Sequence, residues 1–366
     1  MTFTTDTRLI VLTSFITACS LAPRVDANLL DTEPQTRNSP VIETPEAVKL
    51  EPFTGSAVYT YKFEVPPGTG GLTPDVQLSY STLTRGTEYG FGWTLNMSRI
   101  ERSTRFGAPT YWDEQDDFEL DGELLVPDPR SGSNRFHKQH ADFSRIQYLP
   151  GSSPELSYWE VTRTDGTKMR YGSRAAAHSR LTIRPSLTGK VFRWSLDEVI
   201  DARGNSYIVD YECEPGGGPG GTCSGDISYV YPKRIKYSFR PGGGATPPAA
   251  NRRLIVFNWD DRGYPLTSSA HEDIDRPTSY RSGYKVQIGR RLIGVAVGID
   301  SSSGDGEIQS GEQIRRYVLT YAPKTTAASP NEAPFSKLVS IQRYGSNDVK
   351  FPSETNPRAT QFEYSV

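Results

Sequence analysis

The stretch Val65-Pro66-Pro67-Gly68-Thr69-Gly70-Gly71-Leu72-Thr73-Pro74-Asp75-Val76-Gln77-Leu78-Ser79-Tyr80 decides the fold of this chain. Apolar and polar side chains alternate over residues 59–65 before the turn and over 76–80 after it. A period of two is typical of half-buried strands, and Pro-Pro-Gly supplies a fixed φ followed by a permissive one. The stretch therefore predicts two strands joined by a Pro/Gly turn, and it contains no catalytic group.

The composition extends this prediction to the whole chain. Its 366 residues include 33 Gly, 27 Pro, 20 Tyr and 15 Phe but only 3 Met, which favours strands and turns. No stretch keeps helical spacing between capping residues over a dozen positions. The net charge of −2 is dispersed, so no basic field indicates nucleic acid as a partner.

Hairpin signals recur along the chain. Asp121-Gly122 and Asp165-Gly166 each separate two alternating runs, which is a strong short-range hairpin signal. Further strands are predicted at residues 234–239, 254–259, 291–297, 316–321 and 337–343, with a last strand ending at 364. We expect an all-β body over 51–366, in which many antiparallel strands and hairpins with long Gly/Pro loops form a sandwich-like or shell-like structure.

The N-terminus resembles a secretory signal over residues 1–27. Arg8 precedes an apolar run over 9–16, and Ile16-Thr17-Ala18-Cys19 is similar to a bacterial lipobox in which Cys19 is lipidated. Val25-Asp26-Ala27 offers an ordinary signal-peptidase site instead, and a mildly apolar tail is the plain alternative. Residues 28–50 have the composition of a linker. Export is the expectation, to the extracellular space or to an outer-membrane anchor on a bacterium.

Two cysteines flank a glycine-rich loop. Cys213 and Cys223 enclose nine residues between two predicted strands. A disulfide there would close a short loop and stabilise the fold by about 2–3 kcal/mol. Metal binding is disfavoured because the pair lacks CxxC spacing and nearby His residues, and two unpaired thiols are the remaining alternative.

These hairpins, in this order, resemble the N-terminal domain of SpvB-type virulence plasmid B proteins and of the B subunits of insecticidal toxin complexes. The resemblance covers nearly all of the chain from about residue 50. The positions that carry it most clearly are Pro66, Pro67, Gly68, Gly70, Gly71, Leu72, Tyr80, Gly90, Gly92, Trp93, Asp121, Gly122, Gly204 and Asn205.

The resemblance implies a β-rich scaffold related to the Rhs/YD-repeat shells that enclose a toxin. Residues 201–211 are themselves similar to one YD-type repeat. The expected partner is a protein, namely a toxin, propeller or YD-repeat chain, with no cofactor and with an added membrane tether if Cys19 is lipidated. Relatives usually continue into a propeller, shell or toxin, so a lone module, a truncated product and a fragment all stay open.

Four motifs contain residue types that occur in catalytic or metal-binding sites, and none of the four is favoured as a site. Glu212-Cys213-Glu214 fits the Glu-x-Glu of an ADP-ribosyltransferase but lacks its other parts. Asp113-Glu114-Gln115-Asp116-Asp117 and the segment 300–306 offer oxygen ligands for Ca²⁺, yet a solvated strand approach and an open loop explain them as well. His137 and His140 have metal spacing only on a helix. Aromatic side chains on strands are interpreted mainly as core.

The leading hypothesis is therefore a non-enzymatic, exported scaffold module that packs against or encloses another polypeptide. One rival is a surface lipoprotein that binds carbohydrate or a host protein. The other is an enzyme with an unrecognised pair of carboxylates, as in glycoside hydrolysis.

Overall fold

The structure is a computed structural model that describes residues 48–113, 115–128, 130, 134–152, 156–182, 190–213, 229–239, 252–262, 277–300, 306–309, 311–322, 335–346 and 359–364, and the backbone of 2–5 and 8–10. Within these ranges the helical elements are two single turns, η1 (Thr69–Gly71) and η3 (Ala175–Ala177). No described helix is long and apolar enough to cross a membrane. The all-β prediction is confirmed.

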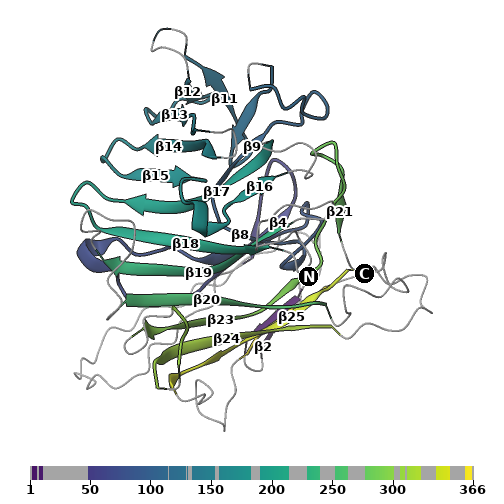
Figure 1. Ribbon diagram of the computed structural model, residues 1–366. Coiled ribbons are helices and arrows are strands. Elements are labelled where there is room, and N and C mark those ends of the chain that lie inside the picture. The colour runs from purple at the N-terminus through teal and green to yellow at the C-terminus, as the bar shows by residue number, and fades with distance from the viewer. Residues whose placement is uncertain are drawn as a thin grey trace, which may run out of the picture.

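An eight-stranded barrel occupies residues 99–200 (Figure 1). Each strand pairs antiparallel with the next, and the last strand returns to the first, so the ring is closed. In ring order the strands are β9 (Arg99–Arg102), β10 (Phe118–Leu120), β11 (Glu123–Pro127), β12 (Arg135–Lys138), β13 (Arg145–Leu149), β14 (Tyr158–Thr162), β15 (Lys168–Tyr171) and β17 (Val191–Ile200). Closure leaves the ring without free edges.

An open antiparallel sheet continues from the barrel through β17. Its remaining strands are β18 (Ser206–Cys213), β19 (Val230–Phe239), β20 (Arg252–Asp260), β23 (Arg291–Asp300), β24 (Gln313–Tyr321), β25 (Leu338–Tyr344) and β26 (Ala359–Glu363). The first half of β17 pairs with β9 and with β16 (Arg180–Thr182), and the second half pairs with β15 and β18. One ten-residue strand therefore joins both parts of the molecule.

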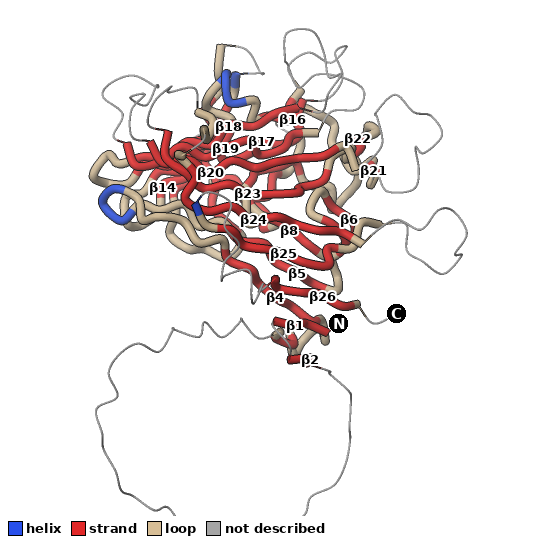
Figure 2. The backbone as a smooth tube through the Cα atoms, turned by 90° about the horizontal axis from the view of Figure 1, so that it is seen from below, coloured by secondary structure: helices blue, strands red, loops and turns tan. Residues whose placement is uncertain are grey.

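A small sheet covers one face of the open sheet. It consists of β3 (Lys49–Leu50), β4 (Ala57–Lys62), β5 (Gln77–Ser81) and β8 (Trp93–Leu95). The two-stranded ribbon of β6 (Gly86–Thr87) and β7 (Gly90–Phe91) connects β5 to β8, and a second short hairpin is formed by β21 (Thr278–Ser279) and β22 (Val286–Gln287). Figure 2 shows β4, β5 and β8 together with the open sheet.

Two large hydrophobic cores follow from this arrangement, beside a small cluster of Leu254, Val256 and Ala296 on β20 and β23. The barrel is filled by aromatic side chains, among which Trp159 contacts Phe118 with ring centroids 4.9 Å apart and Trp194 with centroids 6.1 Å apart. The second core lies between the small and open sheets, where Tyr59, Phe63 and Trp93 pack against strands β18 to β26. Aromatic side chains bury large areas, so most of the aromatic residues that the structure describes serve as core, as the sequence indicated.

The N-terminal residues continue the open sheet at its far edge. Strand β1 (Thr2–Thr5) pairs antiparallel with β26, and β2 (Arg8–Ile10) pairs with β1. The two termini therefore lie close together (Figure 1). The rest of the predicted signal, including Cys19, and residues 28–47 of the predicted linker lie outside the described residues.

Candidate functional site

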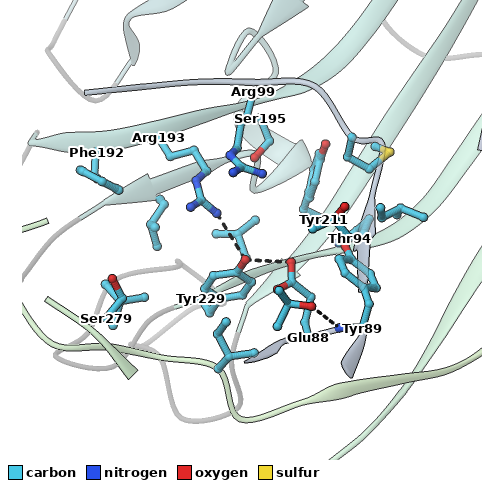
Figure 3. Close-up of a pocket in the computed structure, with 18 of the residues that line it drawn as sticks. Glu88, Tyr89, Thr94, Arg99, Phe192, Arg193, Ser195, Tyr211, Tyr229 and Ser279 are labelled. Atoms are coloured by element: carbon cyan, nitrogen blue, oxygen red, sulfur yellow. Dashed lines mark hydrogen bonds between the residues drawn. The ribbon is translucent and has the colours of Figure 1, made fainter. Parts of the chain in front are cut away.

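A cavity of about 200 Å³ opens where the barrel, the open sheet and the small sheet meet. Its walls come from four separate parts of the chain: the ribbon and strand at 87–99, strands β16 and β17, strands β18 and β19, and the β21–β22 hairpin. Figure 3 shows Arg193, Tyr229 and Glu88 converging at its centre, with Tyr89, Tyr211 and Phe192 around them. No short sequence motif marks this cavity, because its residues are brought together only by the fold.

A chain of polar contacts runs through the cavity wall. The Tyr229 hydroxyl donates to a Glu88 carboxylate oxygen at 2.8 Å and accepts from Arg193 at 3.4 Å. Arg193 also pairs with Glu101 at 3.0 Å, and Arg99 pairs with the same carboxylate at 3.3 Å. Two cations thus face two carboxylates with a phenol between them, so the network is balanced in charge.

The titration of these groups follows from burial and pairing. Burial, reinforced by Glu88, raises the pKa of the Tyr229 phenol, which keeps it a neutral donor. Burial acts to raise the pKa of Glu101 too, but Arg193 and Arg99 outweigh it and hold that pKa below its usual value. Burial disfavours the charge on Arg193, yet Glu101 raises its pKa. The network therefore stays ionised at Glu101 and Arg193 and neutral at Tyr229.

The cavity lining does not assemble an acid–base pair. Glu88 is the single carboxylate among the described residues that line it, beside Arg99 and Arg193. Glycoside hydrolysis needs two carboxyl groups across the bond that breaks. The remaining lining is apolar or hydroxyl-bearing.

The Pro/Gly turn at residues 66–74 contacts the turn at 201–205, which belongs to the YD-like segment 201–211. The Tyr237 hydroxyl donates to the Pro66 carbonyl at 3.0 Å, and Leu72 packs against the barrel core. Gly70 has a φ of +65°, and a Cβ there would lie 2.4 Å from Asn205 Nδ2. Asn205 is fixed in turn by donating to Asp201 at 2.7 Å. Two segments 135 positions apart by number are therefore in contact, with Pro67, Gly68 and Gly71 in the same turn.

The Gly90-Phe91-Gly92-Trp93 segment is held by close approaches. Gly92, with a φ of +85°, leaves no room for a Cβ beside the Tyr80 ring, and Gly90 faces the Tyr321 ring and the Ser336 carbonyl. Trp93 is fully buried, and its indole nitrogen donates to the Tyr364 hydroxyl at 3.0 Å. The segment therefore fastens the small sheet to the C-terminal strands.

The Asp121-Gly122 turn between β10 and β11 has both residues at positive φ, +52° and +83°. The Asp121 carboxylate accepts from Arg99 N at 2.8 Å and from the Ser98 hydroxyl at 2.7 Å. Gly204 lies at φ +82° in the turn that contains Asn205. Asp121, Gly122 and Gly204 therefore shape turns at positive φ.

Two carboxylates of the acidic segment 113–117 form ion pairs with a buried arginine. Arg102 is buried, and its guanidinium contacts Asp113 at 2.5 Å and Asp116 at 2.8 Å. Asp116 also accepts from the Thr110 and Tyr111 backbone nitrogens at 2.8 and 2.7 Å. The expectation of a solvated strand approach is therefore wrong at Asp116, whose side chain is 5 % exposed. Both carboxylates pair with buried Arg102, a contact that the sequence pattern did not reveal.

Local pairing accounts for the other candidate motifs. Asp300 is buried and pairs with Arg252 at 2.8 Å, while 301–305 lie outside the described residues. His140 is exposed and contacts Glu123, and the His137 ring contacts the Lys138 carbonyl. Glu212 pairs with Arg290 at 2.5 Å. Across the described ranges no group of three or more His, Cys, Asp or Glu residues is placed to hold a metal.

Cys213, the last residue of β18, is disulfide-bonded. Cys223 and Glu214 lie outside the described residues. Pairing of Cys213 with Cys223 stays a prediction.

Comparison with known proteins identifies the family. The sequence model described as Salmonella virulence plasmid 65kDa B protein, SpvB, matches residues 51–238, about half of the chain. The chain belongs to the SpvB family. The match begins at the small sheet, includes the whole barrel and ends at β19, so it contains every SpvB-family turn discussed above.

Curated SpvB relatives cover the same part of the chain. Proteins named Mono(ADP-ribosyl)transferase SpvB from Salmonella choleraesuis and Salmonella enteritidis are each 27 % identical over 226 residues, which is 53 % of this chain and 38 % of the relative. The match therefore spans about two fifths of the length of these relatives.

Solved structures share the fold of this SpvB-family chain. The N-terminal domain of effector protein SpvB from Salmonella typhimurium strain LT2 superposes with a TM-score of 0.59 at 21 % identity, covering 78 % of this chain and 99 % of that domain. A crystal structure of TcdB2-TccC3-TEV gives a TM-score of 0.65 at 22 % identity, covering 91 % of this chain and 17 % of that one. A crystal structure of TcdB2-TccC3-Cdc42 gives 0.61 at 21 % identity, covering 84 % and 16 %.

Proposed function

We propose that this chain is an exported, non-enzymatic β-scaffold module that packs against a partner polypeptide, in the manner of the corresponding part of a toxin shell. The observation that carries the proposal is the match to nearly the full length of the SpvB N-terminal domain. The fold also recurs as one part of a larger chain in structures of TcdB2-TccC3.

The construction of the molecule supports a scaffold. The closed barrel and the two-sheet core bury most of the Tyr and Trp side chains, and ion pairs such as Arg102 with Asp116 brace the loops. The family-specific residues lie in turns and at close approaches rather than around a reacting centre. Rigid elements of this kind present a preorganised surface to a partner.

Co-purification tests the proposal. The full chain is produced with each propeller, YD-repeat or toxin chain encoded beside its gene, and complexes are isolated by size exclusion. A stoichiometric complex that protects the partner from protease is expected. Transfer of ADP-ribose from NAD⁺ by the purified chain, or recovery of glycans alone, contradicts the proposal.

Export is part of the same proposal, through the signal predicted at residues 1–27. Intact mass of the mature protein distinguishes the two processing routes. A lipid on an N-terminal Cys19 indicates an outer-membrane tether, and an N-terminus after Ala27 indicates a secreted form. An unprocessed chain retained inside the cell contradicts export.

A further inference from the structure

Among the described strands, the open sheet ends at β26 on the side away from the barrel. On its inner side, β26 pairs antiparallel with β25 through residues 359–361. On its outer side, residues 360–363 pair antiparallel with Thr2–Thr5 of β1, and β1 pairs in turn with β2. Figure 2 shows β26, β1 and β2 in this order at the edge of the sheet. The chain therefore covers its own edge strand with residues 2–10.

An uncovered edge strand readily pairs with other chains. Its outward N–H and C=O groups lack partners within the sheet, and they can pair with another extended segment. Globular proteins therefore cover, shorten or charge such edges. In this molecule the barrel has no edge because it is closed, and β1 supplies the cover for β26.

The two strands that cover β26 belong to the segment that the predicted processing removes. The second of them, β2, ends at Ile10. The two predicted cleavage sites lie later in the chain, before Cys19 and after Ala27. Both routes would separate β1 and β2 from the rest of the chain. The processed protein would then keep β26 without its outer partner.

Strand β26 has anchors that do not involve β1. Phe362 is buried, and its ring centroid lies 4.8 Å from that of Trp93 and 5.8 Å from that of Tyr59. Directly after the strand, the Tyr364 hydroxyl donates to the Leu338 carbonyl at 2.8 Å and accepts from the Trp93 indole. These contacts fasten β26 to the small sheet and to β25. An edge that is already in place loses little entropy when a strand pairs with it.

We propose that the outer edge of β26 is a strand-acceptor site, which residues 2–10 cover before processing and which an extended segment of the partner polypeptide occupies afterwards. The partner and the processing rest on the proposed function, whereas the acceptor edge rests on the pairing with β1. In this mode of binding the backbone groups supply the pairing, and the side chains opposite β26 supply the selectivity.

The register with β1 indicates which partner strand fits. Phe3 pairs with Phe362, and Thr2 pairs with Glu363. Residues directly opposite one another on paired strands lie on the same face of the sheet. Phe362 belongs to the core between the two sheets, so an apolar residue fits opposite it. Glu363 is exposed, so an acidic residue opposite it is repelled, whereas a Lys or Arg is favoured.

Hydrogen exchange on the full chain, produced without export so that residues 1–27 are retained, tests the cover. Phe3→Pro combined with Thr4→Pro, the proline variant, removes two consecutive backbone donors of β1 and is expected to release it from β26. Exchange of the amides of 360–363 is expected to become at least about tenfold faster than in the parent. Phe3→Val combined with Thr4→Val keeps both donors and is the matched control, with exchange as in the parent. Equal exchange in the proline variant and the parent overturns the inference.

A strand of known sequence tests whether the edge accepts a second chain. The probe is a labelled peptide with the sequence of residues 1–10, and fluorescence anisotropy measures its binding. It is expected to bind the proline variant at least about tenfold more tightly than the parent, because the parent's own β1 occupies the edge at a high effective concentration. Equal binding to the two proteins overturns the inference.

Two changes in the peptide test the mode of pairing. Methylation of the backbone nitrogens of Phe3 and Thr4 keeps every side chain but removes two donors, and it is expected to abolish binding. A peptide with Thr2→Lys is expected to bind about threefold more tightly than one with Thr2→Glu, because position 2 lies opposite Glu363. Binding of the methylated peptide as tight as that of the parent peptide contradicts backbone pairing.

Co-purification separates this inference from the proposed function, once circular dichroism and thermal unfolding have established that each variant is folded. A partner held more tightly by the proline variant than by the parent is the expected result. If both hold the partner equally, the scaffold proposal stands and the partner does not use this edge. A proline variant that dimerises through β26 shows that a second copy is the occupant and overturns the choice of partner. If neither protein holds a partner, the scaffold proposal fails, while peptide binding by the proline variant still supports the acceptor edge.

Discussion

Gly70 illustrates at the scale of one residue how two distant turns come into contact. Its φ of +65° is a backbone conformation that residues with a Cβ adopt at a cost, and the Asn205 amide occupies the space where that Cβ would lie. Asn205 cannot move away freely, because its side chain and backbone both donate to Asp201. Glycine at position 70 is therefore required by the tertiary contact with Asn205 as well as by the local turn.

The substitution Gly70→Ala is expected to lower the free energy of unfolding by about 2–3 kcal/mol, which combines the left-handed backbone cost with a steric clash. Gly71→Ala is the control, since Gly71 has a φ of +88° but no atom lies within 4 Å of the position that its methyl group would take. It is expected to cost only about 1 kcal/mol. Urea unfolding at an unchanged m-value measures both. Equal losses at the two positions would show that the Asn205 contact is unimportant.

Asp116 and Arg102 form the ion pair on which the 103–117 loop depends. The side chains are 5 % and 3 % exposed, so removing one charge leaves the other buried with less compensation. Asp116→Ala is expected to destabilise the protein by about 3 kcal/mol or more. Asp75→Ala, which breaks the exposed pair with Lys62, is expected to cost less than about 1 kcal/mol. Urea unfolding compares the two, and similar losses would refute a special role for Asp116.

At the scale of elements, period-two alternation and Asp-Gly turns predicted strands where the structure has them, with differences at the ends. The strand predicted at 234–239 is part of β19, which begins at Val230 and includes Pro232. Proline has no backbone N–H to donate, so within a sheet it is tolerated where the pairing is irregular, as at a β-bulge. The pairing of β18 with β19 shifts register between Asp210 and Tyr211, opposite this proline. Local propensity could not reveal a strand that continues through such a shift.

The end of β18 carries the predicted disulfide. Intact mass without and with reductant is expected to differ by two hydrogens, and peptide mapping is expected to join Cys213 to Cys223. Cys213→Ser is expected to lower stability by about 2–3 kcal/mol, because the unfolded chain gains the entropy of the opened loop. A parent protein whose unfolding is unaffected by reductant would contradict a stabilising role.

At the scale of the whole molecule, the buried phenols set a limit on stability in alkali. Burial raises the pKa of Tyr148, Tyr207 and Tyr237 to about 12 in the folded protein. Between about pH 10 and 12 the unfolded state therefore releases protons that the folded state keeps, so stability falls as pH rises. These phenols contribute stability in full below pH 10 and lose it as the pH passes through their folded pKa values.

Two readouts check this expectation. As the pH is raised, most of the increase in phenolate absorbance is expected only well above pH 10. It is expected to coincide with loss of the near-ultraviolet circular dichroism, because both follow the opening of the barrel. If most phenols titrate near pH 10 while the near-ultraviolet circular dichroism is unchanged, the phenols are not buried as the structure shows.

The amino-acid sequence alone determined the fold class, the main hairpins and the family, because alternation and turn chemistry are local properties that survive without neighbours. Only the tertiary structure decided that residues 99–200 close into a barrel, since closure depends on one strand, β17, pairing with both β9 and β15. Only the tertiary structure placed Arg193, Tyr229 and Glu88 around one cavity and turned the acidic segment at 113–117 toward Arg102. The contacts around the cavity join residues far apart in the chain, and the energies of both sets of contacts come from burial and pairing, which local sequence patterns do not reveal.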